Sequence, residues 1–402
     1  MAASMFLKMY CRAYQGVFRV AVNFLNWKEP ELVKGEGSVK KLPQVVKANG
    51  HNSVLVVTDK GLMGLHLLDG LFEGLDKAGV KYTVYDGTQP NPTIDNIEEA
   101  RKLYIDNNCS AVIAFGGGSP MDCAKAAAAR IARPNKTVQQ MRGTLKILKK
   151  LPTLYAVPTT AGTAAEVTIN YVITDVQKNR KMVCVDVHDI PVVAVVDPDM
   201  MSSMPKGLTA ATGMDALTHA IEGYITKGAW ELSDMFHLKA IEIISRSLRG
   251  AVENTPEGRT DMALGQYIAG MGFSNVGLGI VHSMAHPLGA LYDTPHGVAN
   301  AIILPTVMEY NAPCTGEKYR DIARAMGVKG TENMTQEEYR KAAVDAVRQL
   351  SHDVGIPADL KDIVKPEDVQ FLAESAYADA CRPGNPRDTS VEELKQLYLS
   401  LM

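Results

Sequence analysis

The pattern of hydrophobic and polar positions changes near residue 200. Before that point, short β-branched apolar runs recur at residues 53–58, 81–85, 110–115, 153–157 and 192–196. Continuous apolar runs of this length are typical of strands buried on both faces of a parallel sheet. Segments with helical periodicity, such as 94–107 and 121–132, lie between them. This alternation predicts a doubly wound α/β unit with a mostly parallel sheet.

After residue 200 the strand signals fade and helical periodicity dominates, for example over residues 205–226 and 231–254. In a later helical segment Thr335 is followed three residues on by Glu338, a helix-start pattern. We therefore expect an all-helical second half. The predicted domains are residues 1–203 and 204–402, divided near a Pro- and Ser-containing break.

Composition narrows the class of protein. The chain has 402 residues, 46% of them hydrophobic, and a formal net charge of −3, which excludes a disordered chain. The near-neutral balance predicts no nucleic-acid partner and no anionic membrane partner. Its 6 cysteines are scattered without a CxxC pair, so neither a disulfide framework nor a thiolate zinc site is expected.

Targeting signals are also not expected. No apolar run reaches the roughly 18–20 residues that a membrane helix needs. The apolar stretches at the start of the chain are interrupted by Lys8, Arg12 and Arg19, which argues against a signal peptide. Together with the scattered cysteines, this predicts a cytoplasmic protein.

A candidate phosphate-binding turn follows the apolar run at 110–115. Three glycines, Gly116 to Gly118, precede Ser119, Pro120 and Asp122. Ser119 is expected to cap a helix with Pro120 at its first position and Asp122 completing a capping box, so that backbone N–H groups face an anion. The usual G-x-G-x-x-G fingerprint is missing, and a tight turn without a ligand is the alternative.

Two further features strengthen a nucleotide site. The segment 157–168 leaves a predicted strand and carries Thr159, Thr160 and Thr163, whose hydroxyls could bond phosphate or ribose; a capped helix start is the alternative. Asp59 ends the first strand run. A carboxylate there would accept ribose hydroxyls and repel a 2′-phosphate, which favours NAD over NADP, although a helix N-cap is equally compatible.

Histidines are unevenly distributed: of 9 in the chain, several fall between His219 and His296. Asp215 and His219 are four residues apart, so they share one helix face. His282 and His286 repeat this spacing, and His296 follows in a Pro-His-Gly turn. Solvated or structural side chains are the alternative.

The histidine cluster predicts a divalent metal site. One carboxylate with imidazoles suits Fe²⁺, Zn²⁺, Ni²⁺, Co²⁺ or Mn²⁺ better than Mg²⁺ or Ca²⁺. Spacing leaves open which histidine is not a ligand. Pro287 is expected to end or kink the helix that carries His282 and His286.

Four segments together resemble the iron-containing (group III) alcohol dehydrogenase family: GGGSPMDCAK, PTTAGTAAEVT, GMDALTHAIEGY and GLGIVHSMAHPLGALYDTPHGVANAIILP. The resemblance runs from about residue 50 to the C-terminus. It implies an NAD-binding α/β domain followed by an all-α metal-binding domain, in a dehydroquinate synthase-like architecture. It also implies a homodimer, although about 20 residues precede the family's usual start.

The resemblance carries residue roles onto this chain. It implies metal ligands Asp215, His219, His282 and His296 for Fe²⁺, with Zn²⁺ possible, and leaves His286 as a proton-transferring residue beside the substrate. Substrate contacts would be Asn170, Phe273 and Cys381. Contacts to NAD(H) would be Asp59, Asn91, Gly117, Gly118, Ser119, Asp122, Thr159, Thr160, Thr163 and Lys181.

The implied activity is hydride transfer between NAD(H) and a short-chain aldehyde or alcohol, foremost lactaldehyde and propane-1,2-diol. Sulfoacetaldehyde, 3-hydroxypropionaldehyde, glycolaldehyde and butanal are alternative substrates. A dehydroquinate synthase-like lyase is a remote alternative, because the segment HSMAHPLGA lacks the basic residues such an enzyme needs around a substrate phosphate.

Overall fold

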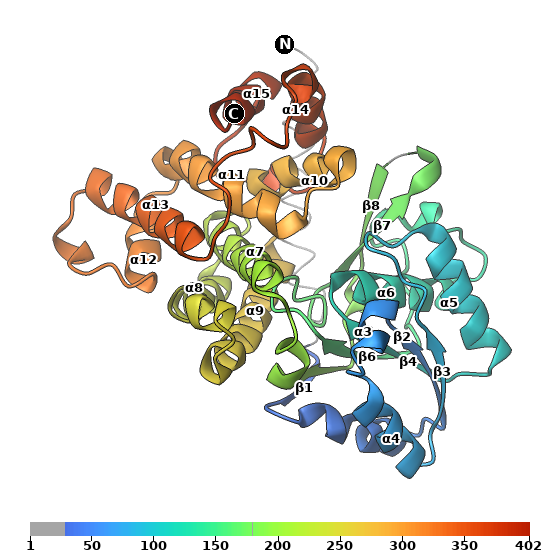
Figure 1. Ribbon diagram of the computed structural model, residues 1–402. Helices are drawn as coiled ribbons and strands as arrows, with labels where there is room; N and C mark the ends of the chain where they lie inside the picture. Colours follow the sequence, from blue (N-terminus) through green and yellow to red (C-terminus); the bar gives the residue numbers. More distant parts are fainter. Residues whose placement is uncertain (1–28, 179) are drawn as a thin grey trace. The chain divides into compact units, whose positions relative to one another are not determined.

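A six-stranded parallel sheet organises the first part of the computed structural model, which describes residues 29–178 and 180–402 (Figure 1). The five predicted strands are confirmed, and β1, which the sequence did not reveal, pairs with β9 at one edge. In spatial order the strands are β1 (Glu31–Lys34), β9 (Val193–Val196), β6 (Thr153–Pro158), β4 (Ala111–Gly116), β2 (Ser53–Val57) and β3 (Lys81–Tyr85).

Both faces of this sheet are buried. On β2, Leu55 and Val57 point into one apolar core and Val54 and Val56 into the other. The first core is closed by α5 (Ile94–Asp106) and α6 (Gly118–Ala132), and the second by α2 (Leu42–Ala48) and α4 (Asp69–Lys77). Burying a Val or Leu side chain completely contributes roughly 1.5–3 kcal/mol to folding stability. Because both faces of the sheet are buried, successive residues of a strand are all apolar.

A second, smaller sheet was not predicted. It contains β5 (Gly143–Thr144), β8 (Arg180–Val185) and β7 (Asn170–Asp175), with β7 and β8 antiparallel. Along β7 buried and half-buried positions alternate. An alternating pattern in so short a strand is harder to recognise in the sequence than the uninterrupted apolar runs of the main sheet. A short helix, α3 (Lys60–Gly64), follows β2.

The described residues after Pro205 form helices and no strands, as predicted. The Thr335–Glu338 capping box is confirmed at the start of α13. The helices are α7 (Lys206–Ile225), α8 (Glu231–Val252), α9 (Pro256–Val276), α10 (Ile280–Tyr292), α11 (His296–Asn311), α12 (Lys318–Ala325), α13 (Gln336–Asp353), α14 (Val369–Tyr377) and α15 (Val391–Ser400).

The chain divides into two compact units, one ending at Met204 and the other running from Pro205 to Met402. The expected division lay one residue earlier. The expectations for Lys8, Arg12 and Arg19 concern residues outside the described part of the chain. Among the described helices, none combines the length and the apolar character that crossing a membrane requires.

Candidate metal and nucleotide sites

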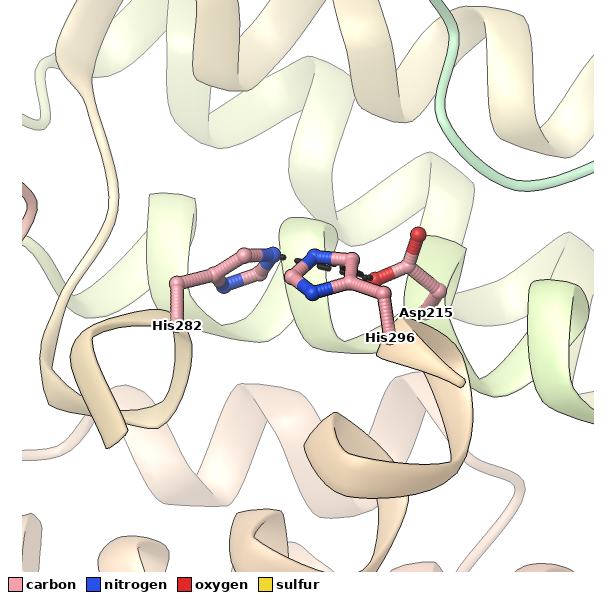
Figure 2. A group of neighbouring side chains, drawn as sticks. All are labelled: Asp215, His282 and His296. Carbon is pink, nitrogen blue, oxygen red and sulfur yellow. Dashed lines mark ion pairs between the residues drawn. The ribbon is translucent and has the colours of Figure 1, made fainter. Parts of the chain in front are cut away.

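Three of the expected metal ligands meet inside the helical unit. Asp215 of α7, His282 of α10 and His296 at the start of α11 point toward one another (Figure 2). Asp215 Oδ1 lies 3.7 Å from the Nε2 atom of each histidine. Ligand bonds of about 2.0–2.2 Å place donor atoms roughly 3–4 Å apart, so the three donors suit one first-row ion.

A glycine makes this convergence possible. A side chain at Gly297 would put its Cβ 2.2 Å from the Ala211 carbonyl oxygen, so only glycine allows α11 to start against α7. Ala211 lies one helical turn before Asp215, and His296 directly precedes Gly297. The close approach of the two helices therefore brings His296 to Asp215. His296 begins a helix, whereas the sequence had suggested a turn.

His219 lies beside this group without joining its tight set of donor atoms. Its ring stacks on Phe273 with centroids 4.2 Å apart and on His282 with centroids 4.6 Å apart. All four expected ligands are therefore neighbours, and the expected substrate residue Phe273 packs directly against one of them. Phe273 comes from α9 and is buried.

Asn300 was missed in the sequence. It lies on α11, one turn after His296, and its Nδ2 is 2.7 Å from Asp215 Oδ1, 3.2 Å from His282 Nε2 and 3.1 Å from His296 Nε2. A single point thus lies within bonding reach of all three donors. Asn300 Oδ1 is buried and has no hydrogen-bond partner among the described residues. This orphaned oxygen and the convergent donors fit a site that takes a cation.

Glu222 was also missed, although it follows His219 by only three residues on α7. It accepts hydrogen bonds from His282 Nδ1 at 2.6 Å and from the Val281 backbone N–H at 2.7 Å. Because a carboxylate only accepts, Nδ1 must carry the proton and Nε2 keeps its lone pair for a metal. Glu222 therefore sets both the tautomer and the orientation of His282.

The charges around these groups favour a cation. Burial alone would raise the pKa of Asp215, but His219, His296 and His282 lower it far below its ordinary value. Burial alone would lower the pKa of His282, but hydrogen bonds to Asp215 and Glu222 raise it to about 9. Two buried carboxylates thus stabilise positive charge here, whether a proton or a metal ion.

His286, expected to be the non-ligand histidine, lies one turn after His282 on α10. Its ring is nearly parallel to that of His296, with centroids 5.4 Å apart, and its Nδ1 lies 2.8 Å from Asp379 Oδ2. The expected substrate residue Cys381 belongs to the same small group of side chains. Burial and the Asp379 carboxylate raise the pKa of Cys381 well above its ordinary value, so this thiol stays protonated.

Pro287 does not end the helix. It lies inside α10, which continues to Tyr292, so the alternative of a helix end at this position is wrong.

The expected nucleotide residues gather where strands β2, β4 and β6 end at the same edge of the sheet. Asp59 follows β2, Gly117 follows β4 and Thr159 follows β6, and these three strands are neighbours. Such carboxyl ends are where doubly wound sheets bind ligands. A side chain at Gly117 would put its Cβ 3.0 Å from Thr160 Cγ2, so the glycine turn and the threonine segment lie against each other.

A side chain at Gly118 would meet Thr163 Cγ2 at the same distance of 3.0 Å. Asn91, in the left-handed backbone region with φ 56°, donates its N–H to Ser119 Oγ at 3.3 Å. Gly118, Thr163, Asn91 and Ser119 are thus brought together at the start of α6.

The structure corrects the predicted capping at this turn. Ser119 is not the N-cap of α6, because the helix begins at Gly118 and its N-cap is Gly117. Asp122 forms no capping box; its Oδ2 accepts from the Val172 N–H of β7 at 3.1 Å. With glycines at the helix entrance, the first N–H groups remain available to an anion.

The two alternative interpretations at the nucleotide residues have different outcomes. The segment from Thr159 to Thr168 forms turns and no helix, so a capped helix start is wrong there. Asp59 does cap α3, accepting from the Leu62 N–H at 2.9 Å. One carboxylate oxygen serves the cap, and a carboxylate can accept further hydrogen bonds from a ligand.

The remaining expected contacts lie on the small sheet. Lys181 of β8 pairs with Thr174 of β7, and Asn170 opens β7. The buried Lys125 of α6 donates its ammonium group to the backbone oxygens of Thr168 at 2.7 Å and Asn170 at 3.0 Å. Lys125 therefore ties Asn170 to the helix that begins at the glycine turn.

Comparison with known proteins matches nearly the whole chain to one family. Residues 30–198 match the family model of iron-containing alcohol dehydrogenases, and residues 209–402 match the model of that family's C-terminal part. Lactaldehyde reductase from Escherichia coli (strain K12) is 55% identical over 366 residues, which is 90% of this chain and 96% of that protein.

Solved structures of alcohol and aldehyde oxidoreductases are similar to this chain over most of its length. A crystal structure of 1,3-propanediol oxidoreductase is similar with a TM-score of 0.91 and 37% identity, covering 94% of this chain and 99% of that one. Sulfoacetaldehyde reductase from Bifidobacterium kashiwanohense, solved in complex with NAD⁺, has a TM-score of 0.84 and 29% identity over 94% of this chain and 98% of that one.

Proposed function

Because the chain belongs to the iron-containing alcohol dehydrogenase family, we propose that it reduces lactaldehyde to propane-1,2-diol with NADH and Fe²⁺, and catalyses the reverse oxidation. The family prediction, and with it the α/β plus helical fold and the class of alcohol and aldehyde oxidoreductases, is confirmed. The observation that carries the metal-dependent chemistry is the convergence of Asp215, His282 and His296 on one point.

The helical unit, expected over residues 204–402, supplies the metal ligands and the proton-transferring residue. Asp215, His219, His282 and His296 would hold a divalent ion, which would supply Lewis acidity at the substrate oxygen, and a bound nicotinamide would supply the hydride. The protein itself holds the metal-ligand atoms in place, so that they need not rearrange when the ion binds. The Glu222–His282 hydrogen bond contributes to this by fixing the His282 ring. His286 transfers the proton that the oxygen gains on reduction.

The α/β unit, expected over residues 1–203, binds the dinucleotide. Backbone N–H groups of Gly118 and Ser119 would hold the pyrophosphate at the start of α6, with Thr160 and Thr163 against the same turn. Asp59 would accept from the adenosine ribose and disfavour a 2′-phosphate, making NAD(H) the preferred form. Asn91, Asp122, Thr159 and Lys181 complete the proposed contact set.

The substrate pocket is proposed to suit a small neutral aldehyde. Within the helical unit, Phe273 would give an apolar wall and Cys381 a protonated thiol. Asn170, which belongs to the α/β unit, remains a separate proposed substrate contact. The cation next to Cys381 in the chain, Arg382, is engaged elsewhere: its guanidinium lies 4.2 Å above the Tyr377 ring and donates to the Tyr377 carbonyl oxygen at 2.5 Å. A sulfonate such as sulfoacetaldehyde would instead meet the Asp379 carboxylate.

The oligomeric state and the cellular location of the enzyme are also part of the proposal. We propose a homodimer, to be tested by size-exclusion chromatography with light scattering. We also propose a cytoplasmic enzyme, since Cys109, Cys123, Cys184, Cys314 and Cys381 are all free thiols.

The test is a comparison of kcat/KM for NADH-dependent reduction of lactaldehyde, glycolaldehyde, 3-hydroxypropionaldehyde, butanal and sulfoacetaldehyde. Metal-stripped enzyme is reloaded with Fe²⁺ or Zn²⁺ before each series. We expect lactaldehyde to be preferred and the stripped enzyme to be inactive. Preference for another aldehyde would overturn the substrate assignment, and inertness toward all of them would overturn the proposed activity.

A further inference from the structure

Two histidines on α10 are held in the same way by two carboxylates from different parts of the chain. His282 Nδ1 pairs with Glu222 Oε2 at 2.6 Å, and one turn later His286 Nδ1 pairs with Asp379 Oδ2 at 2.8 Å. The first pair serves the metal-ligand group. The second pair lies outside that group: among the described residues, His286 and Asp379 form a separate cluster of donor atoms with Cys381.

The Asp379 side chain is also oriented by hydrogen bonds that do not involve His286. Its Oδ1 accepts from the Cys381 backbone N–H at 2.8 Å and from Ser283 Oγ at 3.3 Å, which leaves Oδ2 for the imidazole. The segment behind it is also anchored: Thr226 Oγ1 donates to the Gly384 carbonyl oxygen at 2.7 Å. The orientation of the carboxylate is therefore set by the backbone and by Ser283 on α10.

We propose that Asp379 is the positioning residue that holds His286 in the tautomer and orientation needed for proton transfer to the substrate oxygen. This inference rests on the proposed function and deepens it. Since an ionised carboxylate only accepts hydrogen bonds, Nδ1 of His286 must donate, and Nε2 is left as the atom that exchanges protons. The nearly parallel stacking on His296 keeps that ring beside the metal-ligand group.

The charge of Asp379 supports this arrangement. Burial alone would raise its pKa, but His286 and the Cys381 N–H lower it below the ordinary value, so the carboxylate is ionised at neutral pH. An ionised Asp379 accepts the Nδ1 hydrogen bond of His286 and takes no proton from the ring. The His286 side chain is 20% exposed, so it can exchange protons with water between turnovers.

The proton balance in the direction of reduction is simple. Bound NADH would supply the hydride of the new C–H bond, and the π electrons of the carbonyl would move to oxygen. The Nε2–H bond of imidazolium His286 breaks as the O–H bond forms. His286 is left neutral with Nδ1–H still on Asp379, and a solvent proton restores the imidazolium. In oxidation, neutral Nε2 accepts the hydroxyl proton.

The test compares Asp379→Asn, His286→Ala and the double variant with wild type. We expect Asp379→Asn to lower kcat by roughly 10²–10⁴-fold, as when a general base is held in the wrong tautomer. Bound metal per protomer, the KM for the aldehyde and NADH affinity should change little. The double variant should be no slower than His286→Ala, because the two residues act as one unit.

The matched control is Asp321→Asn, which alters a carboxylate in the same unit that accepts from Tyr224 Oη at 2.9 Å. It should keep wild-type kcat. An Asp379→Asn variant within threefold of wild type, or rate losses that multiply in the double variant, would overturn the role of Asp379. Full turnover of His286→Ala, or of metal-free enzyme, would instead overturn the proposed function.

A second measurement needs no substitution at Asp379. In zinc-loaded wild-type enzyme with isotope-labelled histidine, nuclear magnetic resonance reports the tautomer of His286, assigned by comparison with His286→Ala. A proton on Nδ1 is expected. A neutral ring protonated on Nε2 alone would contradict the proposal.

Discussion

Glu222 accepts hydrogen bonds from both the side chain and the peptide of His282: its Oε2 lies 2.6 Å from Nδ1 and 3.4 Å from the backbone nitrogen. A second oxygen accepts from the Val281 N–H. One buried carboxylate on α7 thus both caps the start of α10 and orients a metal-ligating imidazole. The geometry of the histidine and the start of its helix cannot vary independently.

Replacing Glu222 by Gln should weaken metal binding. The amide has only one accepting oxygen for the donors that Glu222 now serves, so His282 loses its fixed tautomer. We expect roughly 10–100-fold lower metal affinity, measured by competition with a chelator and by metal analysis. Glu253→Gln, which removes an exposed pair with Lys206, is the control. Unchanged affinity in Glu222→Gln would contradict the role of this carboxylate.

Asp59→Asn should shift the preference between the two dinucleotides. Asn is as good an N-cap as Asp, so α3 keeps its start while the charge is removed. We expect kcat/KM with NADPH to rise relative to NADH, because repulsion of the 2′-phosphate is lost. The control is Asp69→Asn, an exposed acidic residue in the first turn of α4. An unchanged cofactor ratio would assign Asp59 to capping alone.

Gly118→Ala should impair cofactor binding more than folding. The new methyl group would lie 3.0 Å from Thr163 Cγ2, at the turn proposed to hold the pyrophosphate. We expect a higher dissociation constant for NADH, measured by fluorescence titration. The control is Gly70→Ala on α4, where nothing lies within 4 Å of the added methyl; it should stabilise the helix by up to about 1 kcal/mol. Equal NADH affinity in both variants would argue against the site.

His237 should make the enzyme less stable in mild acid. Burial, with a smaller effect of Lys318, lowers its pKa to about 3. Below about pH 6.5 the unfolded chain takes up a proton that the folded protein cannot, so stability falls as pH decreases toward 3, by at most about 1.4 kcal/mol per pH unit. The ring fits between two helices, because a side chain at Gly223 or Gly272 would lie 2.2 or 2.4 Å from its Nε2.

The measurement is urea unfolding of wild type and His237→Leu between pH 7 and pH 4. The difference in unfolding free energy should move in favour of the variant as pH falls, since leucine has no proton to gain. His352→Leu, whose side chain is 85% exposed on α13, reports the effect of changing a surface histidine. A difference that does not depend on pH would show that His237 titrates normally.

Much of the fold follows from local pattern. The strands of the main sheet are continuous apolar runs because both faces are covered, and Thr335 with Glu338 starts a helix by local hydrogen bonds alone. The capping of α6 was misjudged at Ser119. That side chain accepts from the Asn91 N–H, a contact between residues 28 positions apart that local rules do not include.

The sequence by itself determined the chemistry available to this protein: a carboxylate and four histidines at helical spacing, and glycines and threonines after successive strands. Only the tertiary structure decided how these groups pair. Glu222, Asn300 and Asp379 were not singled out in the sequence, and each becomes significant through a contact with a histidine 4 to 93 positions away. The physical reason is that hydrogen-bond partners and buried charges are set by helix packing, such as the close approach at Gly297, which no local periodicity encodes.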